Sequence, residues 1–128
     1  MQPGDGVNNP YDKVHELARA IRSSEVFQEL KRLRQQIEQD PAALRMLQDF
    51  RRQQLAYEAG RLAGQADAQE ADRLRKLAEV VMLHQDVRQY LEAEYRWGVF
   101  WSDVQRILAE TIEEALLPLP TEEGEEKR

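Results

Sequence analysis

The stretch YLEAEYRWGVFWSDVQRIL, residues 90–108, holds both tryptophans of the chain, one of its three phenylalanines and two of its four tyrosines. Apolar residues recur at helical spacing through and around it, which predicts one long helix over residues 87–117. Two apolar stripes run along this helix, more than a helix packed on one side needs. In so small a chain the other helices can cover one side, and a second copy of the protein could cover the other.

We therefore predict that the chain dimerises through this last helix. Gly98 supports the prediction, because a glycine inside a helix costs about 1 kcal/mol relative to alanine and suggests close backbone approach or a kink. The alternatives for the aromatic residues are a ligand-binding pocket and insertion into a membrane surface. The flanking acidic residues oppose membrane insertion. The predicted dimer interface consists of Tyr90, Leu91, Trp97, Gly98, Trp101, Val104, Leu108 and Ile112.

Helix-capping residues precede two further helical segments near the start of the chain. Asn8 or Asn9 can cap a first helix, in which Pro10 suits the first position. Ser23 or Ser24 can cap a second helix, whose apolar residues step by four, three and four. Both segments are predicted to be amphipathic helices.

Breaks later in the sequence divide the rest of the chain. Asp40 before Pro41 ends the second helix and caps a third, which runs to about Leu62. A glycine-containing turn near residues 64–67 leads to a fourth helix. At His84-Gln85 either a break, with His84 as a capping residue, or a continuous helix fits the pattern.

Size and composition set the class of protein. A chain of 128 residues, rich in Ala, Leu, Glu, Gln and Arg, predicts one all-α domain of four or five helices, arranged as a long hairpin or bundle. We expect a disordered segment over residues 1–8, the helical domain over residues 9–117 and an acidic disordered tail over residues 118–128. No apolar run approaches the roughly 20 residues of a membrane span, so we expect a cytoplasmic protein without membrane contact.

Motifs for catalysis and cofactors are absent from the sequence. It has no glycine-rich phosphate loop, nucleophile elbow or zinc-protease motif, and the lack of cysteine excludes thiolate catalysis and cysteine-ligated metals. Of the two histidines, His15 fits a helix surface and His84 a helix break, with a ligand role beside Asp86 as the alternative. We therefore predict a protein that is not an enzyme and has no cofactor; a metal- or ligand-binding helical protein ranks third among the functions considered.

Charge is distributed unevenly along the chain. The net charge of −6 argues against nonspecific nucleic-acid binding, yet residues 31–61 carry seven basic residues against four acidic ones. Such a surface could meet RNA or an acidic partner protein, the alternative being a solvated surface with intrahelical ion pairs. The predicted partner surface consists of Arg32, Arg34, Arg45, Arg51 and Arg52.

Two segments carry a family resemblance: NPYDKVHELARAIRSSEVFQELKRLRQQIEQDPAALRMLQDFRRQQ, residues 9–54, and VRQYLEAEYRWGVFWSDVQRILAETI, residues 87–112. In this order, with a glycine-containing loop between them, they resemble the YlbF/YmcA family of bacterial regulators, which includes the YheA-like UPF0342 proteins. The resemblance covers about residues 9–115. It rests on order and pattern, since neither segment holds a catalytic signature.

The resemblance implies an all-α fold of long helices, commonly dimeric, and a non-enzymatic role. Characterised members form a complex that influences competence, sporulation and biofilm formation and acts with the ribonuclease RNase Y in messenger-RNA processing. The implied partners are a second copy, other family members or an RNA-processing complex, and an RNA-binding accessory factor is the rival function. Some members bind iron–sulfur clusters through cysteines that this chain lacks, so the cysteine-free YheA-like branch is the nearer comparison. Relatives often have Asn-Pro where this chain has His84-Gln85.

Overall fold

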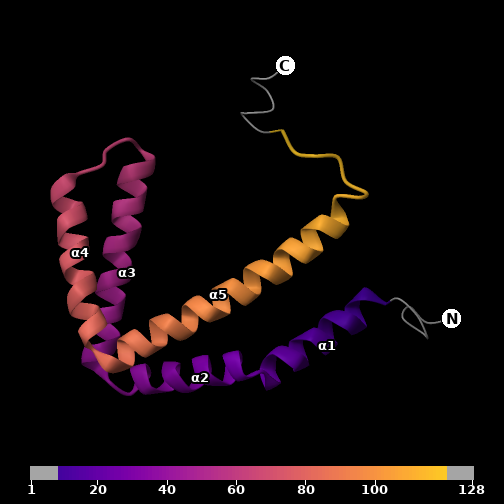
Figure 1. Ribbon diagram of the computed structural model, residues 1–128, viewed down its shortest axis with the longest axis horizontal. Helices are drawn as coiled ribbons and strands as arrows, with labels where there is room; N and C mark the ends of the chain where they lie inside the picture. Colours follow the sequence, from indigo (N-terminus) through magenta and orange to yellow (C-terminus); the bar gives the residue numbers. More distant parts are fainter. Residues whose placement is uncertain (1–8, 121–128) are drawn as a thin grey trace. The chain divides into compact units, whose positions relative to one another are not determined.

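The computed structural model describes residues 9–120, which contain five α-helices and no strand within that range (Figure 1). The helices are α1 (Pro10–Ser23), α2 (Glu25–Glu38), α3 (Pro41–Leu62), α4 (Ala68–Leu83) and α5 (Gln85–Ile112). The predicted all-α class is confirmed.

The described residues fall into two compact units, one up to Trp97 and one from Gly98 onward, so their boundary lies inside α5. The prediction of a single domain over residues 9–117 stays a prediction. Residues 1–8, predicted to be disordered, and residues 121–128 of the predicted tail lie outside the described residues.

Side-chain caps begin the helices where the sequence predicts them. Asn9 caps α1 by accepting a hydrogen bond from the Tyr11 N–H at 3.0 Å. Ser24 ends α1 and caps α2 by accepting from the Phe27 N–H at 3.2 Å. Asp40 caps α3 by accepting from the Ala43 N–H at 3.2 Å. Each cap satisfies an amide that has no partner inside the first turn of its helix.

The turn between α3 and α4 depends on Gly64, whose φ of +73° lies in the left-handed region that favours glycine. The Gln65 N–H donates to the Gly60 carbonyl at 2.7 Å, and the Gly64 N–H donates to the Arg61 carbonyl at 3.1 Å. These two bonds form a Schellman motif, which ends α3 and reverses the chain. The turn predicted over residues 64–67 is confirmed, and α3 and α4 form an antiparallel hairpin (Figure 1).

A break at His84 separates α4 from α5. Of the two alternatives left by the sequence, a break or a continuous helix, the structure has the break. The His84 backbone is extended, and its N–H donates to the Val81 carbonyl at the end of α4. Its Nδ1 accepts a hydrogen bond from the Val87 N–H at 3.3 Å, which caps α5. Because Nδ1 is the acceptor, the ring proton of the neutral imidazole lies on Nε2, 3.8 Å from Asp40 Oδ2.

Replacing His84 by alanine is therefore expected to lower the free energy of unfolding by about 1 kcal/mol, the usual cost of losing a helix cap. The matched control is His84→Asn, which keeps a side-chain acceptor at the same place and should recover most of that loss. Urea unfolding followed by circular dichroism measures both. Equal losses for the two variants would show that the cap is not what His84 contributes.

The end of α5 corrects the sequence prediction, which extended the last helix to about Leu117. The helix runs from Gln85 to Ile112, and residues 113–115 form a turn. In that turn the Glu114 N–H donates to Thr111 and the Ala115 N–H to Ile112, which tightens the backbone into bonds three residues apart. Glu113 and Glu114 lie beside the negative end of the helix dipole, where their charge is unfavourable. The side chains of residues 113–120 are all exposed, so little contact holds another turn.

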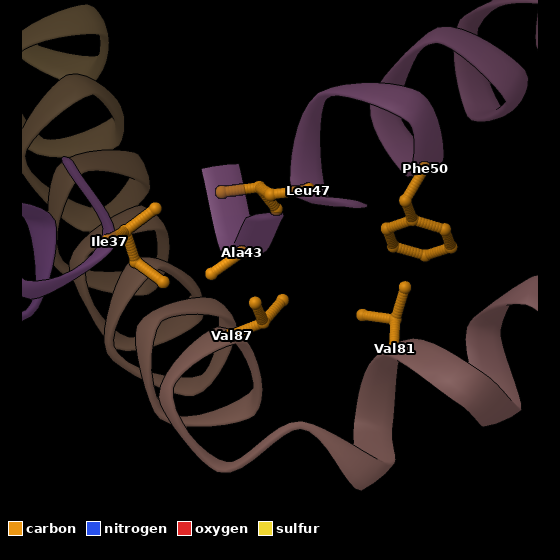
Figure 2. Close-up of a cluster of buried hydrophobic side chains, with 6 residues drawn as sticks. All are labelled: Ile37, Ala43, Leu47, Phe50, Val81 and Val87. Carbon is orange, nitrogen blue, oxygen red and sulfur yellow. The ribbon is translucent and has the colours of Figure 1, made fainter. Parts of the chain in front are cut away.

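The core of the first unit joins four helices (Figure 2). Phe50 and Val81 point toward each other across the hairpin, while Val87 brings the first turn of α5 against α3. Val81 and Val87 are completely buried, so this cluster fixes the hairpin and the start of α5 together. Its members are Ile37, Ala43, Leu47, Phe50, Val81 and Val87.

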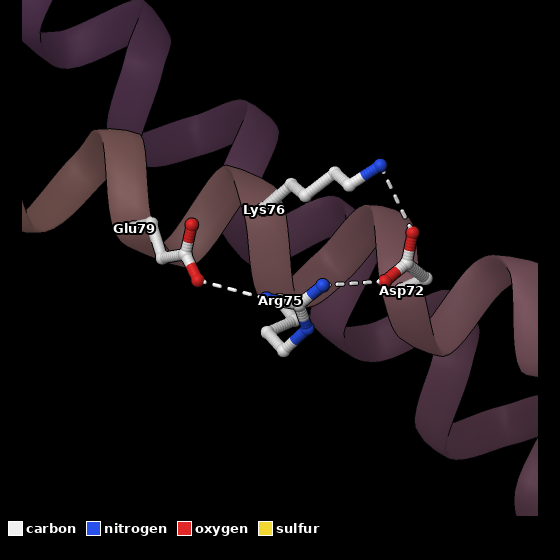
Figure 3. Close-up of polar contacts among 4 residues, drawn as sticks. All are labelled: Asp72, Arg75, Lys76 and Glu79. Carbon is white, nitrogen blue, oxygen red and sulfur yellow. Dashed lines mark hydrogen bonds and ion pairs between the residues drawn. The ribbon is translucent and has the colours of Figure 1, made fainter.

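The solvent side of α4 carries a network of ion pairs (Figure 3). Arg75 donates hydrogen bonds to Asp72 at 2.6 Å and to Glu79 at 2.8 Å, and Lys76 Nζ lies 3.1 Å from Asp72. The hydrogen bond from Arg75, then that from Lys76, holds the pKa of Asp72 below its usual value. These residues are three or four positions apart, so the network stabilises the helix itself and does not gather its carboxylates into a site.

Candidate interaction surface

Apolar side chains occupy one side of α5 from Trp97 to Ile112. At 100° per residue they fall within an arc of about 140°, so the two stripes predicted from the sequence are adjacent and form one broad surface. We call it the α5 surface; it consists of Trp97, Phe100, Trp101, Val104, Ile107, Leu108 and Ile112. Its exposure is high for apolar residues, with 55% of Ile107, 54% of Leu108 and 50% of Ile112 accessible to solvent. Clustered apolar exposure of this kind marks an interaction site.

The residues predicted for the dimer interface divide between two surroundings. Tyr90 and Leu91 are half-buried and pack against the core of their own chain. The other predicted residues lie farther along α5, where Trp97 and Val104 are half-buried and Gly98, Trp101, Leu108 and Ile112 are exposed. Six of the eight predicted positions therefore lie within or beside the α5 surface.

Gly98 has open space around its Cα. A Cβ built there would meet no other atom of the described residues within 4 Å, apart from the neighbouring backbone of its own helix. The close approach that the sequence suggested is therefore not made within the described chain, and approach by a second chain stays a prediction.

A cluster of polar residues joins α3 to α5. Arg51 forms an ion pair with Glu94, 43 positions along the chain, and its guanidinium lies 5.8 Å from the centre of the Tyr90 ring. The hydrogen bond to Glu94 raises the pKa of Arg51. Burial, followed by the negative charge of Glu94, raises the pKa of the Tyr90 hydroxyl. The cluster thus adds a polar contact between α3 and α5 next to the apolar core, against which Tyr90 packs.

Removing this contact should have a modest effect, because the Arg51 and Glu94 side chains are 41% and 37% exposed and water screens their charges. A double-mutant cycle with Arg51→Ala and Glu94→Ala is expected to give a coupling energy of about 1 kcal/mol or less. The exposed Glu58–Arg61 pair within α3 is the control and should couple more weakly. A coupling several times larger would mean that the cluster, rather than the apolar core, fixes α5.

An open groove of about 710 Å³ lies beside the Arg51–Glu94 pair, between the hairpin and α5. Its walls are mostly apolar and aromatic. They are formed by Phe50, Arg51, Gln54, Leu55, Tyr57, Glu58, Leu74, Leu91, Glu94 and Tyr95. The sequence does not predict this groove, because its residues come from three helices and no spacing pattern links them.

The five arginines predicted as a partner surface do not share one side of the molecule. Arg32 and Arg34 are two positions apart on α2, so they point in nearly opposite directions around the helix. Arg34 and Arg51 line a second groove, of about 320 Å³. Arg34 also pairs with Glu38 at 3.5 Å, and Arg52 pairs with Asp49. Three of the five are thus engaged with carboxylates of their own chain.

The remaining arginines and the histidines are dispersed. For Arg32 and Arg45 there is no ion pair with another of the residues between 9 and 120. His15 lies exposed on α1, as the sequence predicts for a surface residue. Over the same range no group of three or more His, Asp or Glu side chains is arranged to hold a metal ion. None of the helices described is long and apolar enough to cross a membrane.

The fold and this surface define an all-helical protein whose distinctive feature is a long terminal helix with an exposed apolar side. The chain belongs to the YlbF/YmcA family, because residues 11–113 match the family model described as "Control of competence regulator ComK, YlbF/YmcA". The resemblance predicted from the sequence is confirmed.

Relatives and a solved structure place the chain more closely. It is 36% identical over 99 residues to a UPF0342 protein of Halothermothrix orenii, covering 77% of this chain and 84% of the relative. It is 38% identical over 109 residues to a UPF0342 protein of Alkalihalophilus pseudofirmus, covering 84% and 92%. The fold is similar to that of a solved "Protein of Unknown Function (DUF964) from Bacillus stearothermophilus", with a TM-score of 0.70, 26% identity, and 84% of this chain and 95% of that one covered.

Proposed function

We propose that this chain is a non-enzymatic regulatory adaptor that acts through protein–protein contacts, and that it does so as a homodimer formed through the α5 surface. The observation that carries the proposal is the exposure of Ile107, Leu108 and Ile112 on one side of a helix. Water contact with so much clustered apolar area is unfavourable, and covering it with a second apolar helix removes that cost.

Membership of the YlbF/YmcA family supports a regulatory role. The polar residues of the described chain support it as well. Most of their ion pairs lie within helices, and Arg51–Glu94 and Arg96–Glu29 tie α5 to α3 and α2. The described polar residues do not converge on the larger groove as a set of acid, base and nucleophile. A partner would be another family member or an RNA-processing complex, as the family resemblance implies, and the site of action would be the cytoplasm.

The rival function is an RNA-binding accessory factor, for which the arginines of α2 and α3 would contact phosphates. Three of the five arginines pair with carboxylates of their own chain, which favours the adaptor, because an arginine that already pairs must give up that contact to bind RNA.

Sedimentation equilibrium of the purified protein, freed of RNA and then with total cellular RNA added back, separates the two functions. The adaptor predicts a dimer in both samples. A monomer that gains mass only with RNA, and loses that gain at high salt, would overturn the adaptor in favour of the RNA-binding factor. Charge reversal at Arg32 and Arg45, which breaks no ion pair among residues 9–120, is the matched variant.

A further inference from the structure

A second exposed apolar surface lies on α1. No side chain of this helix is buried, and 77% of Tyr11 and 61% of Val14 are accessible to solvent. The apolar residues fall within an arc of about 120° at 100° per residue. We call this the α1 surface; it consists of Tyr11, Val14, Leu17, Ala18 and Ile21.

Basic residues border the α1 surface on both edges. Arg22 lies about 20° beyond Tyr11 around the helix, and Lys13 lies about 40° beyond Leu17 on the opposite edge. The two acidic residues of α1, Asp12 and Glu16, lie on the far side of the helix. Lys13 pairs with Glu16 at 3.2 Å, so Arg22 contributes most of the positive charge of the rim that would meet a partner.

Acidic residues border the α5 surface. Asp103 and Glu110 lie about 40° and 60° beyond Ile107, and the opposite edge carries uncharged residues. Glu113 and Glu114 follow directly after the helix, so residues 103–114 hold four acidic residues against one basic residue, Arg106. Arg106 lies 3.6 Å from Asp103 and 3.4 Å from Glu110, which offsets part of their charge, but the four acidic residues against one basic residue leave this rim negative.

The two surfaces match in length as well as in charge. The 14 residues of α1 extend over about 21 Å, and residues 97–112 of α5 extend over about 24 Å at 1.5 Å per residue. We infer that, in the dimer of the proposed function on which this inference rests, α1 of one copy covers the α5 surface of the other copy. The opposite charges of the two rims favour the packing of α1 on the α5 surface. Packing of α1 on α1 of the other copy would place like charges side by side and is disfavoured.

The absence of cysteine from the sequence makes disulfide cross-linking a direct test. The Val14→Cys variant is mixed with a tagged chain that carries Phe100→Cys, Val104→Cys or Leu108→Cys. The mixture is left until the two kinds of chain have exchanged partners, and it is then oxidised. A mixed disulfide between the two chains is expected for at least one position of α5, because a disulfide needs Cα atoms within about 7 Å. Glu16→Cys, on the far side of α1, is the matched control and should cross-link at least 10-fold less.

The cross-linking pattern distinguishes this pairing of α1 with α5 of the other copy from the alternatives. Cross-linking between copies of Leu108→Cys, with Val14→Cys no better than the control, overturns it while leaving the homodimer of the proposed function intact. Closure of the double variant Val14→Cys/Leu108→Cys into an oxidised monomer also overturns it, since α1 then covers α5 of its own chain. A sample that sediments as a monomer and forms no cross-link overturns the proposed function together with the inference.

Discussion

Phe50→Ala is expected to lower the free energy of unfolding by about 3–5 kcal/mol, which is a large part of the stability of a domain this small. Phe50 is 8% exposed and faces Val81 across the hairpin (Figure 2). Truncation removes its ring from the point where α3 and α4 meet, and the helices on either side cannot close the resulting cavity without moving other core residues. Urea unfolding at equilibrium measures the loss.

Leu55→Ala is the matched control, because Leu55 lies on the same helix but is 71% exposed. It removes an apolar side chain of similar size, yet little buried contact, and should change the free energy of unfolding by no more than about 0.5 kcal/mol. Comparable losses for the two variants would mean that the core does not lie where the structure places it.

Trp101→Glu should raise the dissociation constant of the proposed dimer at least about 100-fold. The substitution places a carboxylate in the middle of the α5 surface, where burial without a partner costs about 3–5 kcal/mol. The monomer should remain folded, since Trp101 is 41% exposed and lies outside the core cluster. Sedimentation velocity over a concentration series measures the change, and circular dichroism checks the fold.

Ser102→Glu is the control for this variant, because it introduces the same charge at the neighbouring exposed position, about 100° away around the helix. It should leave the dissociation constant within a few-fold of the starting protein. A folded, undissociated dimer of Trp101→Glu would contradict the proposed interface. Leu108→Glu places the same charge elsewhere on the α5 surface and should also weaken the dimer, which shows that the effect is not specific to Trp101.

Local signals made much of the fold predictable from the sequence. Asp40 before Pro41 and Gly64 after α3 act through their own backbone neighbourhoods, so the type of residue was enough to place a helix start and a turn. The apolar surface of α5 was predictable for a similar reason, since its apolar residues recur with the 3.6-residue period of a helix.

Other features depend on contacts that no local pattern encodes. Arg51 and Glu94 meet only because the fold brings α3 beside α5. In the sequence they are 43 positions apart, and no local pattern links the two charges. The end of α5 was predicted five residues too late, because the apolar periodicity continues through Leu116 and Leu117, which are 65% and 90% exposed. The proposed arginine surface took its residues from charge counts, which ignore the direction in which each side chain leaves its helix.

The central claim is that the α5 surface is covered by a second copy, and amide hydrogen exchange at a series of protein concentrations tests it most directly. The amides of residues 98–112 should exchange more slowly as the concentration rises through the dissociation constant, because dimer formation stabilises the helix there. Amides around Val81 and Phe50 should be unaffected by dilution. Exchange of residues 98–112 that is equally fast at every concentration, in a protein whose core amides are protected, would contradict the claim.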